Sequence, residues 1–273
     1  MEAESLTLMI QTCGKYSDLW EPHMAFLSQN WPGHPPAVLV TDEPTNAVFP
    51  GVEVFAAGAG LHMPGRLAAV LPRIQTKYIL LTLDDYFPVY PINTAEIARL
   101  VKIMDAKGLD YIRLFPDPPS FRPFPGQKEV YRINLNSDYA VNLYPGLWRK
   151  SFLEATLPGP ADIWAYEVSL THTARQRNAK CAMTWGREFP VLDVIRKGKL
   201  LRRAKRFLSR RGICLESRET VPLWEEIRIF CFNWGKKLLP RPAARWVKKQ
   251  LRKWGFSFYT DQFEENYDTN TAN

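Results

Sequence analysis

The sequence is poor in cysteine and histidine, and neither residue forms a pattern that binds metal. Four cysteines, Cys13, Cys181, Cys214 and Cys231, are scattered along 273 residues with no Cys-x-x-Cys pair. The four histidines show no spacing typical of a set of metal ligands. This distribution argues against a zinc site and against a disulfide framework, and it is typical of a protein in a reducing cytoplasm.

Long hydrophobic runs are also missing, because no uninterrupted apolar segment is long enough to span a bilayer. The acidic stretch from Met1 to Ser5 lacks the basic and apolar regions of a signal peptide. The chain is 46% hydrophobic and 13% aromatic, which suits a globular protein with one large core, with or without a small appendage. We therefore expect a cytoplasmic protein, either soluble or peripheral on the inner face of the cytoplasmic membrane.

Positive charge is concentrated in one part of the chain. Residues 196–255 carry 19 Lys and Arg against 4 Glu, whereas residues 1–195 carry 17 Lys and Arg against 20 Asp and Glu. We therefore predict three regions, with a boundary near Gly198. They are a folded domain over 1–198, a basic helical region over 199–258, and a polar, disordered tail over 259–273.

Short apolar runs alternate with helical patterns through the first region, and this alternation is typical of an α/β protein with a mostly parallel sheet flanked by helices. We expect strands at 6–12, 37–41, 52–55, 77–83, 110–115, within 130–144, at 181–185 and at 190–195. We expect helices at 17–29, 66–74, 95–106, 147–153 and 162–177. Successive strand ends should face one crevice, since parallel crossovers are right-handed.

The most informative stretch is the apolar run from Lys77 to Leu83, which ends abruptly in Asp84 and Asp85. A run that is apolar at nearly every position indicates a strand buried on both faces of a parallel sheet. Two acids at its carboxyl end would lie at the crevice where such sheets bind ligands. A divalent cation held together with substrate phosphates would remove their mutual repulsion. The alternative is a solvated turn after a core strand, where Asp is also common.

The basic region interleaves Lys and Arg with apolar residues. One cationic amphipathic segment covers residues 200–211, and apolar stripes follow over 223–238 and 247–254. Such faces suit an anionic membrane surface, and nucleic acid is a less suitable partner because the apolar faces are continuous. Alternatively, these helices pack on the folded domain and expose their charges to water. The sequence does not specify an oligomeric state.

Four features occur in order over most of residues 6–200: the strand at 6–12 with its polar turn, Arg66 followed by the 77–87 stretch, the segment 142–153, and Ile163 to Glu167. Together they resemble bacterial GT-A-fold glycosyltransferases of surface polysaccharide biosynthesis. The resemblance implies a GT-A-like (Rossmann-like) sheet, a nucleotide-sugar donor, a glycan or lipid-linked glycan acceptor, and Mn²⁺ or Mg²⁺ as cofactor. This chain has adjacent aspartates, Asp84 and Asp85, where the family usually has Asp-x-Asp.

The resemblance assigns a role to several residues of this chain. Asp85 would be the main metal contact, and Asp84 would face the ribose or the waters of the metal. Other residues would contact the nucleotide, the sugar or the diphosphate: Thr12, Gly14, Asp42, Arg66, Trp148, Lys197 and Lys199. Thr12, Gly14 and Asp42 could equally be turn residues, Trp148 could be a core tryptophan, and the two lysines could belong to a basic surface.

Glu167 is the candidate general base. It lies near the start of a predicted helix, close to Trp164 and Tyr166, where an aromatic environment could raise the pKa of its carboxyl. Acids also favour helix N-termini regardless of function. Asp162 is closer to that N-terminus and fits the capping role better.

Two functions follow from these observations. The first is an inverting, metal-assisted glycosyltransferase in which Glu167 deprotonates the acceptor. The second is a non-catalytic α/β module that binds membrane or nucleic acid through its basic C-terminal helices.

Overall fold

A computed structural model describes residues 5–157, 159–215 and 217–226. The chain divides into two compact units, residues 1–192 and 193–273. The division falls slightly before the predicted boundary at Gly198, because the short hairpin around this glycine is part of the second unit.

The first unit contains an eight-stranded sheet in the order β3-β2-β1-β4-β8-β6-β9-β7. Neighbouring strands pair in parallel except around β8 and β7, which run opposite to the rest. The strands are β1 (Leu6–Gln11), β2 (Ala37–Thr41), β3 (Val52–Ala56), β4 (Tyr78–Leu83), β6 (Tyr111–Arg113), β7 (Tyr131–Arg132), β8 (Gly146–Arg149) and β9 (Cys181–Met183). Two further short strands are β5 (Tyr86–Phe87) and β10 (Leu192–Asp193).

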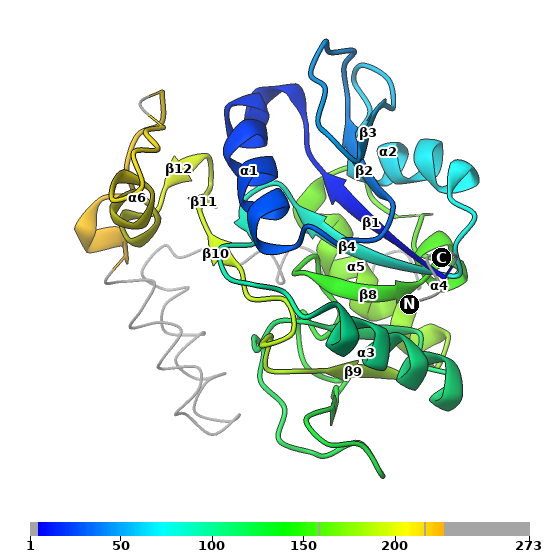
Figure 1. Ribbon diagram of the computed structural model, residues 1–273. Helices are drawn as coiled ribbons and strands as arrows, with labels where there is room; N and C mark the ends of the chain where they lie inside the picture. The colour runs from blue at the N-terminus through cyan, green and yellow to red at the C-terminus, as the bar shows by residue number, and fades with distance from the viewer. Residues whose placement is uncertain (1–4, 158, 216, 227–273) are drawn as a thin grey trace, which may run out of the picture. The chain divides into compact units, whose positions relative to one another are not determined.

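Helices cover both faces of this sheet, as Figure 1 shows. On one face, Leu8 and Ile10 of β1 pack with α1 (Trp20–Asn30), which the short 3₁₀ helix η1 (Gly14–Leu19) precedes in sequence, and with α3 (Thr94–Lys107). The other face, which includes Met9, packs with α2 (Met63–Val70), η2 (Leu71–Arg73), α4 (Lys150–Glu154) and α5 (Ile163–Gln176). All six residues of β1 are buried, as expected for a strand covered on both sides. The predicted fold class, a mostly parallel α/β sheet flanked by helices, is confirmed.

The strand order reverses direction next to β1. The chain moves from β1 outward to β2 and β3, and then returns to place β4 on the other side of β1. In open α/β sheets, ligands bind outside the carboxyl ends of the strands at such a switch point. The fold therefore directs attention to the turns that follow β1, β2 and β4.

Several local predictions hold, and two are wrong. Asn93 caps α3 by accepting a hydrogen bond from Ala95 N at 3.0 Å, and Gly108 ends it with φ of +62°. The helix predicted at 147–153 begins later, because residues up to Arg149 form the antiparallel strand β8 between β4 and β6. The helix predicted from Arg66 begins at Met63, with Pro64 in its first turn, and becomes a 3₁₀ turn at 71–73.

The second unit begins with a hairpin of β11 (Ile195–Arg196) and β12 (Lys199–Leu200), followed by α6 (Arg202–Ser209). The apolar side chains of Ala204 and Leu208 on α6 are buried. Its basic side chains are exposed: Arg202, Arg203, Lys205 and Arg206. The apolar side of this segment therefore faces protein, and its basic side faces water.

Most of the predicted basic region after α6, including the stripe at 247–254, lies outside the described residues, and so does the predicted tail 259–273. No helix within the part of the chain that the structure describes has the length and apolar character needed to cross a membrane.

Candidate active site

The turns after β1, β2 and β4 meet at one edge of the sheet. The backbone N–H of Asp84, after β4, donates to Gln11 O at 3.2 Å, and that of Thr12, after β1, donates to Val40 O at 2.9 Å. Asp42, after β2, accepts a hydrogen bond from Gly14 N at 2.7 Å through its Oδ1. Four residues predicted from the sequence, Thr12, Gly14, Asp42 and Asp84, therefore lie together at the switch point.

Asp84 is held on the α1 side of this edge. Only 6% of Asp84 is exposed, and its Oδ2 accepts a short hydrogen bond from the hydroxyl of Thr12. Trp20 Nε1 donates to that hydroxyl at 2.7 Å, and His23 Nδ1 donates to the backbone carbonyl of Asp84 at 2.9 Å. We predicted that Asp84 faces the ribose or metal-bound water. In the structure its side chain ties the end of β4 to the end of β1, and the role toward the ribose or metal-bound water stays a prediction.

His23 shows how strongly this support is buried. The imidazole is 1% exposed, and burial lowers its pKa to about 4, although the hydrogen bond to Asp84 acts in the opposite direction. Its ring packs edge-on against Phe87 at a centroid distance of 5.5 Å. His23 is therefore neutral at pH 7, and its Nδ1–H donates a hydrogen bond to the turn that carries the acid pair.

Asp42 and Arg66 form the charged part of the edge. Burial raises the pKa of Asp42, but hydrogen bonds from Gly14 N, from its own backbone N–H and from the Thr41 hydroxyl, with a smaller effect of the nearby Arg66 guanidinium, outweigh it and hold the pKa below its usual value. Arg66 donates from Nη1 to Leu61 O at 2.8 Å. The same guanidinium also lowers the pKa of the Cys13 thiol, although burial and the charges of Asp84 and Asp42 leave that pKa raised. Arg66 thus projects its charge toward the turns after β1 and β2.

Two buried polar atoms near these turns have no hydrogen-bond partner within the described residues. They are Gln11 Oε1, at the carboxyl end of β1, and Arg66 Nε, on α2. A buried polar atom without a partner costs free energy, of the order of 1–3 kcal/mol, and calls for a specific reason. A polar ligand at this edge would supply one, because Gln11 Oε1 accepts and Arg66 Nε donates.

Asp85 is the second acid of the pair, and it is half-buried. The next residue, Tyr86, packs its ring against Phe115 and Tyr144 at centroid distances of 6.1 and 5.8 Å. These contacts fix the backbone immediately after Asp85. Its carboxylate therefore belongs to a turn that is anchored on both sides, by Asp84 on β1 and by Tyr86 on the following loops.

The residues present fit a phosphate-bound cation better than a metal held by protein alone. Among the described residues, no group of three or more His, Cys, Asp and Glu side chains could hold a metal ion. Mg²⁺ bound through substrate phosphates requires only one or two carboxylates, which keeps Asp85 suitable as its ligand.

Comparison with known proteins gives partial likenesses. No protein-family model matches the chain, and no curated protein matches it. A structure of Staphylococcus aureus TarS 1-349 is 16% identical with a TM-score of 0.46, covering 68% of this chain and 59% of that one. The same protein in complex with UDP-GlcNAc is 15% identical with a TM-score of 0.47, covering 72% and 60%.

A third similar structure is the bifunctional IspDF from Campylobacter jejuni, at 13% identity and a TM-score of 0.43, covering 69% of this chain and 52% of that one. This chain therefore spans about three fifths or less of the length of these proteins. Likeness at this level leaves the ligand and the activity of this chain to be argued from its own residues.

Glu167 approaches the same edge from the other face of the sheet. It lies on α5, and its Oε1 accepts a hydrogen bond from Leu143 N at 3.1 Å. Leu143 precedes β8, whose first residue, Gly146, pairs with Leu81 near the carboxyl end of β4. Since Tyr144 contacts Tyr86, the segment that Glu167 binds lies against the residue that follows Asp85.

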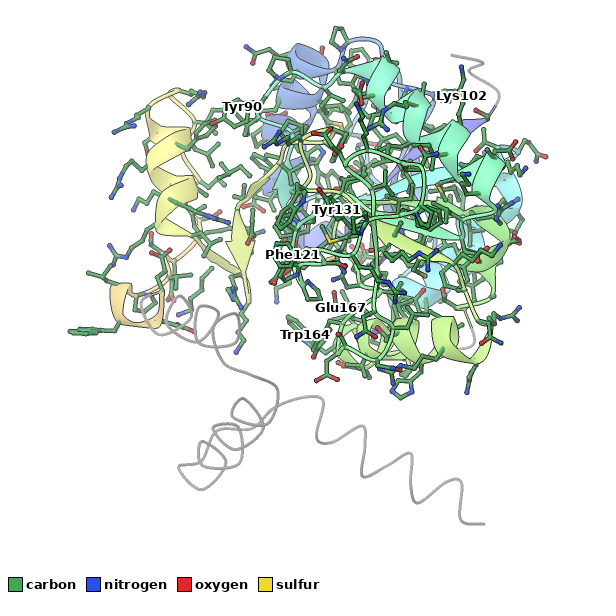
Figure 2. The ribbon with its side chains drawn as sticks, turned by 90° about the horizontal axis from the view of Figure 1, so that it is seen from below. Tyr90, Lys102, Phe121, Tyr131, Trp164 and Glu167 are labelled. Carbon is green, nitrogen blue, oxygen red and sulfur yellow. The ribbon has the colours of Figure 1, made fainter. Side chains whose placement is uncertain are left out.

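The pKa of the Glu167 carboxyl is shifted in the direction that the role of general base requires. Burial raises the pKa of its carboxyl, and the hydrogen bond from Leu143 N only partly offsets this effect. Asp162 is the N-cap of α5, because its Oδ1 accepts from Trp164 N and Ala165 N at 3.1 and 3.0 Å. Capping is therefore performed by Asp162, and Glu167 is left with a raised pKa one turn further along the helix (Figure 2).

Trp148 does not lie at the ligand edge. The side chain is 0% exposed, and it packs between Tyr111 and Phe152 at centroid distances of 4.4 and 5.8 Å. The prediction that it stacks on a sugar is wrong, because its position on the central strand β8 places its ring in the core.

The two lysines belong to the second unit. Lys197 lies in the turn of the β11–β12 hairpin, with φ of +50°, and Lys199 forms an ion pair with Glu219 at 2.8 Å. This pairing favours their interpretation as a basic surface. Their role with a diphosphate remains a prediction.

Sequence reasoning missed the residues that support the site from behind. His23 and Trp20 lie on α1 with apolar neighbours, and their local pattern is that of core residues. Arg113 was also missed: it is 1% exposed and donates to Phe115 O at 2.9 Å and to Ala140 O at 2.7 Å. An arginine inside an apolar strand is the one signal that could have revealed this anchor, since a buried charge requires partners.

Proposed function

We propose that the protein is a nucleotide-sugar-dependent glycosyltransferase. The observation that carries this proposal is the meeting of Thr12, Gly14, Asp42 and Arg66 with the Asp84–Asp85 pair at the switch point of a mostly parallel sheet. Ligands of open α/β sheets bind at this position. The sequence resemblance to GT-A-fold enzymes independently supports the same edge as the donor site.

The donor would be held by groups of complementary chemistry. Backbone and side-chain groups of the β1 and β2 turns, with Gln11 Oε1 as a buried acceptor, suit a nucleoside. Arg66 offers a positive charge and a buried N–H that forms no hydrogen bond with other described residues, which suits a diphosphate. Asp85 would hold Mn²⁺ or Mg²⁺. When bound there, such a cation would offset the negative charge of the diphosphate.

Glu167 is assigned the role of general base. Its carboxylate would take the proton of an acceptor hydroxyl as the acceptor oxygen forms a bond to the anomeric carbon. The bond between that carbon and the diphosphate oxygen would break, and the nucleoside diphosphate would leave with the electron pair. Attack opposite the leaving group inverts the anomeric configuration. A general base contributes roughly 10²–10⁴-fold.

We also propose that the acceptor is a glycan or lipid-linked glycan at an anionic membrane surface. The exposed basic side of α6 supports this, because each basic residue near anionic lipid contributes about 1 kcal/mol. The buried apolar side of α6 means that charge, not insertion, would provide this contact.

A thermal-shift screen tests the proposal. The protein is heated with UDP-, GDP- or CMP-linked sugars, each with and without Mn²⁺. Stabilisation by one nucleotide class is expected, with a larger shift in the presence of the cation. The matched control is Lys102→Ala, a change on the exposed side of α3, which should behave like the wild type. No stabilisation by any donor, together with tight binding to anionic vesicles or oligonucleotides, would identify a non-catalytic module instead.

A further inference from the structure

Three aromatic side chains form a partly exposed cluster on the β7–β9 side of the sheet. Phe121 is 74% exposed and Trp185 is 36% exposed, and their ring centroids are 5.4 Å apart. Tyr131, at the start of β7, contacts Trp185 edge-on at 6.0 Å. We call Phe121, Tyr131 and Trp185 the outer aromatic cluster. Phe121 and Tyr131 are labelled in Figure 2.

The outer aromatic cluster is carried by a well-braced backbone. Tyr131 belongs to β7, which pairs with β9, and the segment before it folds back along β7. Arg132 N donates to Arg122 O at 2.8 Å, and Phe124 N donates to Val130 O at 2.8 Å. The rings are therefore presented in a fixed arrangement, so that binding a ligand there requires little ordering.

The cluster lies at the same sheet edge as the candidate active site. Trp185 follows the carboxyl end of β9, which is parallel to β6 and, through β8, runs in the same direction as β4. The next residue, Gly186, has φ of +74°. A Cβ there would be 2.8 Å from Leu114 O and 3.6 Å from Phe115 Cα, so the turn lies directly against Phe115.

A second set of rings continues from that point to the acid pair. Phe115 stacks on Tyr144 at 4.3 Å and contacts Tyr86 at 6.1 Å, and Tyr86 is bonded to Asp85. We call Tyr86, Phe115 and Tyr144 the inner aromatic row. An unbroken series of contacts therefore leads from Asp85, along the inner aromatic row and Gly186, to the outer aromatic cluster.

The chemistry of this surface suits a saccharide. Aromatic faces can cover the apolar C–H faces of pyranose rings, and polar groups beside them can bind the hydroxyls. Such polar groups are present, since Arg122 is exposed and Arg187 forms an exposed ion pair with Glu129 at 3.9 Å. Charges of both signs beside the rings favour a hydroxyl-rich ligand over an anionic lipid surface.

We propose that the outer aromatic cluster binds the saccharide chain of the acceptor, at sugar units beyond the one that receives the transferred sugar. This proposal rests on the proposed function for the place of the acceptor, but the binding of sugar chains can be measured by itself. It predicts that long acceptors bind better than short ones.

Ligand-observed NMR tests the proposal, with maltohexaose, cellohexaose, chitohexaose and an array of bacterial polysaccharide fragments as probes. The wild type should bind at least one of these chains, and Trp185→Ala and Phe121→Ala should each weaken binding by about tenfold or more. Trp185→Phe, which keeps an aromatic ring, should restore much of the affinity. Tyr90→Ala is the matched control, since Tyr90 is 56% exposed but belongs to neither aromatic set.

The outcomes separate this proposal from the function on which it rests. Loss of sugar binding in the alanine variants, with an unchanged thermal shift on donor binding, supports it. Sugar binding that depends on Trp185 without any donor binding would contradict the transferase and leave the saccharide site standing. Equal binding in all variants would overturn the proposal, as would binding of no probe. The same variants should also be tested against vesicles of phosphatidylcholine and phosphatidylglycerol. If the wild type binds these vesicles and the alanine variants bind them more weakly, the cluster is a membrane contact, and the saccharide proposal is overturned.

Discussion

The two halves of the sheet edge are built differently. The half formed by β1, β2 and β4 ends in turns whose carboxylates accept hydrogen bonds from a neighbouring turn, Asp84 from the Thr12 hydroxyl and Asp42 from Gly14 N. The half formed by β6, β8 and β9 ends in longer segments that expose aromatic rings, as Phe121 and Trp185 show. Short, bonded turns hold charges in place, whereas braced longer loops offer a broad contact surface. Under the proposed function the first half would hold the donor and the second the acceptor, and we call them the donor half and the acceptor half.

The largest effect is expected from Asp85. We expect Asp85→Ala to abolish sugar transfer, because the proposed cation would lose its carboxylate while the bonded framework around Asp84 remains. Transfer of radiolabelled sugar and the melting temperature should be measured together. Retention of full activity in Asp85→Ala would refute the role of the donor half.

The next largest effect should come from Glu167, in the acceptor half. We expect Glu167→Gln to lower kcat by roughly 10²–10⁴-fold, which is the usual contribution of a general base. The base acts when deprotonated, so wild-type activity should fall as the pH drops through a pKa raised above the ordinary value of 4.5. The pH–rate profile of Glu167→Gln should lack this limb.

Asp162→Ala is the control for that experiment. Loss of the N-cap should cost about 0.5–2 kcal/mol of stability, since the side chain satisfies two backbone N–H groups of α5. The Asp162→Ala variant should still lose activity at low pH as the wild type does, because Glu167 is unchanged. If Asp162→Ala and Glu167→Gln lose activity equally, Glu167 has no special place in catalysis.

Protonation of His23 tests the donor half through stability and should leave the chemistry of transfer unchanged. His23 has a pKa of about 4 when folded against 6.5 when unfolded, so the unfolded chain binds more protons between these values and stability falls as the pH drops from 6.5 to 4. The loss should be about 3 kcal/mol. Urea unfolding at pH 7 and pH 4 should show a smaller difference in His23→Gln than in the wild type. Identical pH dependence in both proteins would show that His23 is not buried in neutral form.

The donor half was largely predictable, for a physical reason. An apolar run in the sequence predicts a strand that is buried on both faces. Polar residues that interrupt the run mark the end of the strand, as Asp84 and Asp85 do after Leu83. Thr12, Gly14 and Asp42 were assigned by the resemblance to GT-A-fold enzymes, and the structure brings their turns to the edge where β4 ends.

The acceptor half was predicted less well. Trp148 belongs to a segment whose local pattern suits a helix, but the gap between β4 and β6 turns residues 146–149 into a strand and buries the ring. Phe121, Tyr131 and Trp185 are separated in sequence, and only the pairing of β7 with β9 brings them together.

The sequence by itself determined the fold class, the position of the acid pair and the concentration of positive charge after residue 195. Only the tertiary structure decided which polar groups are buried, that Asp84 ties the end of β4 to the end of β1, and where exposed rings gather. Apolar periodicity is a property of residues that are close in the sequence, so it can be read from the sequence directly. Burial and contact between distant residues depend on strand order, which no local pattern records.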